Sequence, residues 1–61
     1  MTEQEIKDYF GTAPVYKFTG SLDELHNLMI SLSTGYNYLV DQYQIYFVAQ
    51  APVQDNRAVV I

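Results

Sequence analysis

The stretch YNYLVDQYQIYFVAQ, residues 36–50, decides the fold because its composition predicts two strands joined by a turn. Tyrosine, valine, isoleucine and phenylalanine dominate it, and these residue types favour β-strands. Asp41-Gln42 is the only polar pair in its middle, so we place the turn there. A two-residue loop at this position gives the cross-strand pairs Val40 with Tyr43, Tyr38 with Ile45 and Tyr36 with Phe47.

This register gives the hairpin one apolar face and one mixed face. The apolar face carries Tyr36, Tyr38, Val40, Tyr43, Ile45 and Phe47, and the mixed face carries Asn37, Leu39, Gln44 and Tyr46. A loop one residue longer would instead pair Val40 with Gln44 and Tyr38 with Tyr46. Asp-Gln is not the Asn-Gly or Asp-Gly sequence of a two-residue turn, so this alternative stays open. We prefer the shorter loop because it separates apolar from polar side chains more cleanly.

Residues 21–35 carry the clearest helical pattern in the chain. Ser21-Leu22-Asp23-Glu24 is a capping box, in which the serine oxygen and the glutamate carboxylate satisfy free amides of the first turn. Large apolar side chains then recur at helical spacing on one face, namely Leu22, Leu25, Leu28, Met29 and Leu32. His26 and Ile30 lie together on one flank of this stripe. We expect Gly35 to end the helix as its left-handed residue.

A second capping box, Thr2-Glu3-Gln4-Glu5, predicts a short helix over residues 3–10. Its apolar face carries Ile6, Tyr9 and Phe10. Gly11 offers a left-handed end to this helix. A helix of this length is not stable alone in water, so its apolar face must pack on the rest of the chain.

Two further segments have the composition of strands. Residues 15–19 alternate, with Tyr16 and Phe18 on one side. Residues 58–61, AVVI, form a β-prone tail that we expect to pair with a strand of this chain or of a second copy. The order is therefore α-β-α-β-β-β in a single domain over residues 1–61. We predict an α+β fold, with the second helix packed on one face of an antiparallel sheet.

The length of the chain limits the core that it can build. A chain of 61 residues buries only about 60% of its unfolded surface. It has no cysteine and one histidine, which argues against a disulfide framework and against a structural zinc site. Self-association would supplement so small a core, so we predict a homodimer. The absence of cysteine fits a reducing cytoplasm.

The charge balance argues against two classes of partner. Seven carboxylates outnumber three Lys and Arg residues, and the formal net charge is −4. Direct nucleic-acid binding requires clustered cations, and so does binding to an anionic membrane surface. We expect neither, and no segment is apolar for long enough to span a bilayer. A DNA-mimicking inhibitor remains an alternative, although mimicry needs acids aligned on one surface and these are dispersed along the chain.

No residues have the spacing of a catalytic, metal or phosphate site. Asp23 and Glu24 are adjacent acids, but they occupy a first helical turn, where negative charge stabilises the helix dipole. His26 has no nucleophile one helical turn away. The three glycines mark element boundaries and do not form a phosphate loop. We therefore predict that the chain is not an enzyme and has no cofactor, metal ion or small-molecule substrate.

The mixed face of the hairpin is the predicted protein interface. Tyr46, Leu39 and Val48 place apolar groups on the side away from the second helix, and tyrosine is enriched at interface hot spots. The terminal strand adds Val59 and Ile61. Either the N-terminal helix or a second copy of the chain is expected to cover this apolar face, because an open patch of this kind is a liability on a monomer.

Size, charge and the lack of catalytic groups favour a small non-enzymatic protein-binding module of the cytoplasm. Compact acidic chains of this kind are often encoded by phages or mobile elements as inhibitors of a larger host or defence protein. One alternative is a small structural or assembly subunit of a larger complex. Another is a small-molecule sensor whose tyrosines line a pocket at a dimer interface.

Overall fold

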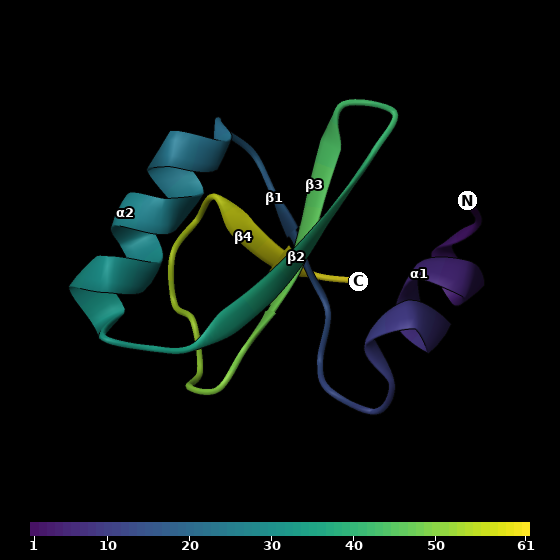
Figure 1. The fold of residues 1–61 in the computed structure, drawn as a ribbon, viewed down its shortest axis with the longest axis horizontal. Helices are drawn as coiled ribbons and strands as arrows, with labels where there is room; N and C mark the ends of the chain where they lie inside the picture. The colour runs from purple at the N-terminus through teal and green to yellow at the C-terminus, as the bar shows by residue number, and fades with distance from the viewer.

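Two helices lie on opposite sides of a four-stranded antiparallel sheet in the computed structural model, which describes residues 1–61 (Figure 1). The elements are α1 Glu3–Phe10, β1 Tyr16–Phe18, α2 Leu22–Leu32, β2 Tyr36–Asp41, β3 Gln44–Ala49 and β4 Ala58–Val60. This order and class confirm the predicted α+β fold.

The sheet has the strand order β2-β3-β1-β4. β1 therefore lies between β3 and the terminal strand, with Lys17 opposite Tyr46 on one side and opposite Val59 on the other. The predicted C-terminal strand thus pairs with a strand of its own chain. β2 and β4 form the two outer edges, and α2 connects β1 to the distant edge strand β2.

Both capping boxes form as predicted. The Thr2 hydroxyl accepts from the Glu5 amide, and the Ser21 hydroxyl accepts from the Glu24 amide. Each glutamate in turn accepts from the backbone amide of its cap residue, which lowers the pKa of both carboxyl groups. These reciprocal bonds fix where α1 and α2 begin.

The end of α2 differs from the prediction. Ser33, not Gly35, is the left-handed residue, with φ of 52°. The Ser33 amide donates to the carbonyl of Ile30, and the Thr34 hydroxyl accepts from the Ala51 amide. Because the chain must leave the helix early enough to begin β2 at Tyr36, the turn falls before Gly35, which is already paired with the strand opposite.

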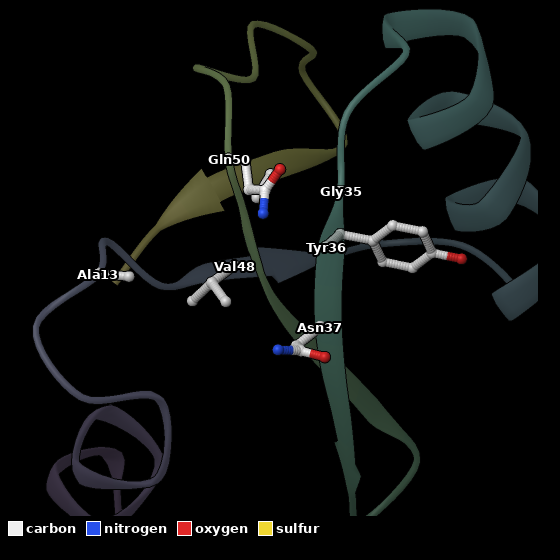
Figure 2. Close-up of a pocket in the computed structure, with 7 residues that line it drawn as sticks. Ala13, Gly35, Tyr36, Asn37, Val48 and Gln50 are labelled. Atoms are coloured by element: carbon white, nitrogen blue, oxygen red, sulfur yellow. The ribbon is translucent and has the colours of Figure 1, made fainter.

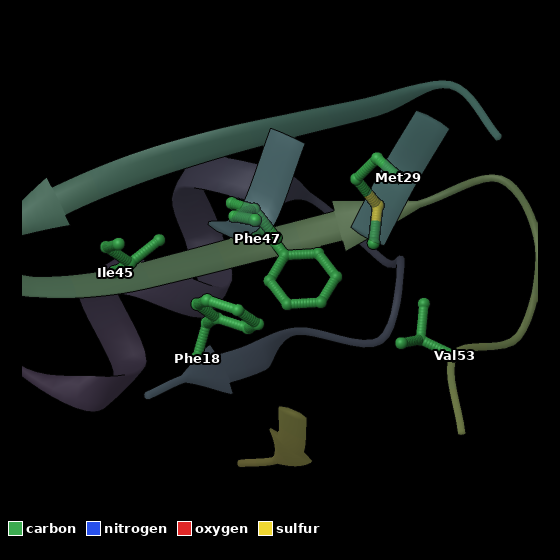
Figure 3. Close-up of a cluster of buried hydrophobic side chains, with 6 residues drawn as sticks. Phe18, Met29, Ile45, Phe47 and Val53 are labelled. Carbon is green, nitrogen blue, oxygen red and sulfur yellow. The ribbon is translucent and has the colours of Figure 1, made fainter. Parts of the chain in front are cut away.

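The main core lies between α2 and the sheet. Its buried side chains are Phe18, Leu25, Met29, Ile45, Phe47 and Val53 (Figure 3). Phe47 is central, because its ring stacks on Tyr16 with centroids 5.0 Å apart and meets Phe18 edge-on at 6.1 Å. The predicted helical stripe supplies Leu25 and Met29, whereas Leu32 at its end is exposed.

α1 covers the opposite face with a much smaller contact. Ile6 is its single buried residue, and Val15 is the other buried residue outside the main core. Tyr9, predicted to share the apolar face with Ile6, is 62% exposed. Its ring instead packs edge-on against Phe10 at 5.0 Å. Eight residues make little more than two helical turns, so only one of the three predicted side chains reaches the sheet fully.

The register of the β2–β3 hairpin corrects both predicted alternatives. Gln42 and Tyr43, rather than Asp41 and Gln42, form the two-residue loop. The pairs are Tyr36 with Ala49, Tyr38 with Phe47, Val40 with Ile45 and Asp41 with Gln44. The predicted division into two faces nevertheless survives, because a shift of two residues leaves side-chain alternation unchanged. The exception is Tyr43, which was expected on the apolar face and lies in the turn.

Candidate protein-binding surfaces

The residues predicted as an interface share one face of the sheet, on the side of α1. Leu39 is paired with Tyr46, Tyr46 with Lys17, and Lys17 with Val59, which makes one row across all four strands. One step along the same registers, Val48 lies beside Val15 and the Ile61 amide donates to the Val15 carbonyl. The structure therefore gathers Leu39, Tyr46, Val48, Val59 and Ile61 on one surface.

Most of this surface is partly covered within the chain. Leu39, Tyr46, Val48 and Ile61 are half-buried, and only Val59, at 60% exposure, is open. α1 lies over this side of the sheet (Figure 1) and buries Ile6 there. Coverage by the N-terminal helix was one of the two predicted arrangements. As a partner interface, these five residues stay a prediction.

The most exposed apolar side chain is Tyr43, at the tip of the β2–β3 hairpin. Its exposed fraction is 101%. Gln42 and Tyr43 have φ of 50° and 67°, so both occupy the left-handed region that asparagine and glycine favour in two-residue turns. A left-handed conformation costs an ordinary residue roughly 1–2 kcal/mol. The fold gains no buried contact from the Tyr43 ring in return.

The base of this hairpin is held firmly. The Gln44 side-chain amide donates to the Phe18 carbonyl at 2.8 Å and to the Ile45 carbonyl at 3.1 Å, which ties β3 to β1 just below the turn. On the other strand, the Asp41 carboxylate pairs with the N-terminal ammonium of Met1 at 3.1 Å. Side-chain contacts therefore hold both strands just below the turn that carries Tyr43. Binding of its ring by a partner then costs less entropy than the ordering of a flexible loop would.

A second exposed surface follows the outer edge of β2. The Gln50 amide donates to the Gly35 carbonyl at 2.9 Å, which marks a hydrogen-bonded pair of the antiparallel ladder. Such pairs alternate along the strands. The odd-numbered residues of β2 therefore turn their backbone toward β3, and the even-numbered residues Tyr36, Tyr38 and Val40 turn theirs outward, where no strand pairs with them.

The side chains along this edge are apolar and aromatic. His26 on α2 shares a hydrogen bond with the Tyr36 hydroxyl, and its ring lies 5.6 Å from that of Tyr38. Tyr38 and Val40 are 41% and 45% exposed, and Ile30, one turn beyond His26 on the same flank of α2, is 72% exposed. We call this the β2 edge surface: His26, Ile30, Tyr36, Tyr38 and Val40.

Two open hollows of about 430 and 340 Å³ lie at the opposite end of the hairpin from its tip. The larger one is lined by Ala13, Gly35, Tyr36, Asn37, Val48, Ala49 and Gln50 (Figure 2). The Tyr36 ring points away from it, toward α2. The lining has no carboxylate, histidine or cation, so the hollow supplies only amides and small apolar groups.

Charged groups are mostly paired within the chain. Arg57 contacts Asp55 at 3.0 Å and Glu24 at 3.7 Å, and its guanidinium lies 5.5 Å from the centre of the Phe18 ring. The bonds from Arg57 lower the pKa of Asp55 to about 2. Lys7 pairs with Glu3 at 3.6 Å. No three acidic, histidine or cysteine side chains are close enough together to hold a metal ion.

Neither helix has the length and apolar character needed to cross a membrane. Comparison with protein-family models, with curated proteins and with solved structures gives no match. The exposed surfaces of the fold are therefore the basis for inferring function. Sequence reasoning placed Tyr43 on the apolar face of the hairpin, and its position at the tip was missed because the turn lacks the asparagine and glycine that normally mark one.

Proposed function

We propose that this chain is a non-enzymatic protein-binding module that inhibits a larger protein by inserting the Tyr43 hairpin tip into a recess on it. The observation that supports this proposal is a fully exposed tyrosine held in a left-handed turn conformation. Backbone strain persists where function requires it and concentrates at binding and active sites. A glycine at this position would relieve the strain, so the presence of a tyrosine side chain there points to recognition.

Tyrosine suits this role because it brings a large apolar body and a polar hydroxyl with few rotatable bonds. The net charge of −4 favours a partner whose recess has a positive rim, since complementary charge speeds encounter. We place the module in the cytoplasm. Its size and acidity fit one functional class, the inhibitors of host or defence proteins that phages and mobile elements encode.

The DNA-mimicking alternative has less support. Ion pairs within the chain engage four of the seven carboxylates, those of Glu3, Glu24, Asp41 and Asp55. A mimic presents unneutralised acids to its target, because they replace phosphates. The alternative of an assembly subunit makes the same use of an exposed surface, but would require the partner for a stable fold.

The first experiment identifies the partner by its contact with the tip. A photoreactive phenylalanine analogue is placed at position 43 and, as a matched control, at position 9, since Tyr9 is also exposed, at 62%. After irradiation in the source cell, we expect one protein to be crosslinked from position 43 and not from position 9. Equal yields from both positions would contradict a specific tip contact.

The second experiment measures the affinity of that protein for two variants. Tyr43→Ser should weaken binding on the order of a hundredfold, as expected for an interface hot spot, while Tyr9→Ser should leave it within about threefold. The turn variant Gln42→Asn/Tyr43→Gly should bind as poorly as Tyr43→Ser, yet melt at a higher temperature because it fits the turn. Full binding by this variant would refute the proposal.

A further inference from the structure

We infer that two copies of this chain pair through their β2 edges, as antiparallel neighbours around a two-fold axis, to form one continuous eight-stranded sheet. The inference goes beyond the proposed function and uses a different surface, since the Tyr43 tip lies past the end of β2. Its basis is the outer edge of β2, which has six residues, no proline, glycine or lysine, and a single charge at Asp41.

The free backbone groups on this edge are arranged to pair with another extended strand. Tyr36, Tyr38 and Val40 each direct an amide and a carbonyl outward, as the ladder with β3 requires. Natural proteins protect such edges with short strands, charges, proline or bulges. β4 follows that rule with only three residues. β2 has none of these protections between residues 36 and 40, so we expect another strand to pair with it.

A second copy fits this edge in one register better than in its neighbours. If Tyr38 faces Tyr38 of the second copy, then Tyr36 faces Val40 on both sides of the axis. All three outward-facing residues of each strand then join hydrogen-bonded pairs. A shift by two residues in either direction would leave one outward-facing residue of each strand without a partner. The centre of the dimer is therefore the Tyr38 pair.

Charge permits the pairing although both copies are acidic. No formal charge lies between residues 36 and 40. In this register the two Asp41 carboxylates lie roughly 20 Å apart along the strands, beyond the Debye length of about 8 Å at physiological salt. Each is also neutralised by its own N-terminal ammonium, at 3.1 Å. A strand of a different protein could pair with the same backbone groups. However, residues 36–40 carry no charge that would select such a protein.

The pairing also covers exposed apolar side chains. In an antiparallel edge-to-edge dimer both α2 helices lie on the same side of the sheet, and the flank that carries His26 and Ile30 faces the axis. Ile30, at 72% exposure, is the open apolar residue of this flank. A contact built from one edge strand and a helix flank is expected to be smaller than the usual 800 Å² or so per partner, so we expect a dissociation constant on the order of 10 μM.

The two Tyr43 tips remain free in this arrangement. They point in opposite directions along the joined sheet, roughly 30 Å apart. A dimer therefore presents two tips at opposite ends. Loss of dimerisation and loss of tip binding are separable outcomes, because they depend on different residues.

Sedimentation equilibrium of the full chain tests the inference. We expect a concentration-dependent dimer, weakened about tenfold or more by Tyr38→Lys and likewise by Tyr38→Glu, because each variant sets like charges directly opposite each other. An equimolar mixture of these two variants should restore a dimer close to wild-type affinity. Val60→Lys, the matched change on the opposite edge strand, should leave the dimer unchanged, because Val60 is exposed, faces the α2 side and turns its backbone away from β1.

Several results would overturn the inference. A wild-type chain that stays monomeric at about 500 μM, well above the expected dissociation constant, would refute the dimer. Loss of the dimer in Val60→Lys would move the interface to the other edge, and failure of the mixture to associate would refute the Tyr38 centre. If the position-38 variants unfold, hydrogen exchange of the wild-type backbone amides still tests the pairing. The amides of Tyr36, Tyr38 and Val40 should gain protection with concentration, and an unchanged rate would refute the pairing.

Discussion

The face of the sheet under α2 and the face under α1 are built from the same four strands, but they differ greatly in how much they bury. Under α2, six buried side chains form one cluster around Phe47. Under α1, Ile6 and Val15 are the buried residues, and the row from Leu39 to Val59 is only partly covered. An 11-residue helix places two turns of apolar residues on the sheet, whereas an 8-residue helix places one side chain. The difference suggests that the α2 face holds the fold and that the α1 face can open.

Phe47→Ala should have the largest effect. Phe47 is fully buried and contacts two aromatic rings, so we expect a loss of about 3–5 kcal/mol in the free energy of unfolding. A domain of this size has little more than that in total, so the variant should be largely unfolded at 25 °C by circular dichroism. Val60→Ala, a truncation at an exposed site, is the control and should change stability by less than about 0.5 kcal/mol.

Ile6→Ala should cost less than Phe47→Ala, although Ile6 is only 2% exposed. We expect about 2 kcal/mol, the low end for an isoleucine truncation, because α1 can detach while the sheet and α2 stay folded. Hydrogen exchange should then show α1 amides unprotected and β3 amides still protected. Complete unfolding of this variant would mean that the two faces are equally necessary, and the comparison between them would fail.

Tyr46→Ala tests how far α1 covers its face. Tyr46 is half-buried between Leu39 and Lys17, so we expect a loss of about 1–2 kcal/mol by chemical denaturation. The sequence alone placed Tyr46 in a predicted protein interface, and an exposed contact of that kind would cost little stability when removed. A value near zero would restore that prediction and show Tyr46 free for a partner. A loss as large as that of Phe47→Ala would make this face part of the core.

Acidification should weaken the α2 face through Asp55. Its pKa is lowered from 3.8 to about 2 by hydrogen bonds from Arg57, which also contacts Glu24 at the start of α2. A lowered carboxyl pKa contributes stability that is present above the unfolded pKa and is lost as pH falls toward the folded pKa. The wild-type melting temperature should therefore fall more steeply than that of Asp55→Asn between about pH 4 and pH 2. Parallel curves would show that the Asp55–Arg57 pair is not linked to folding.

The helices were predictable because their determinants are local. Two capping boxes fix where α1 and α2 begin, and the apolar stripe identifies Leu25 and Met29 as core residues. The strands and their faces were predictable from alternation, which also placed Tyr46 and Leu39 on the same side. These patterns depend on a few neighbouring residues and do not require knowledge of the rest of the chain.

The register and the candidate tip could not be predicted, for a physical reason. Pairing Tyr38 with Ile45 or with Phe47 gives the same two faces, so hydrophobic alternation cannot distinguish the two registers. Turn chemistry normally decides between them, but Gln42 and Tyr43 adopt left-handed conformations without the residues that favour them. The sequence misleads at the position that we propose is functional, where local rules are most often broken.

The strand order has a consequence for the path of folding. Only β2 and β3 are neighbours both in sequence and in the sheet, whereas β1 pairs with strands that follow it at a distance along the chain. Closing the hairpin first therefore costs the least loop entropy, and we expect it to form part of the folding nucleus. The Gln42-Tyr43 turn then sits at the rate-limiting step. In stopped-flow refolding, Gln42→Asn/Tyr43→Gly should fold faster, and an unchanged rate would show that the hairpin closes after the barrier. A recognition tyrosine at the tip would thus lower the folding rate of the chain.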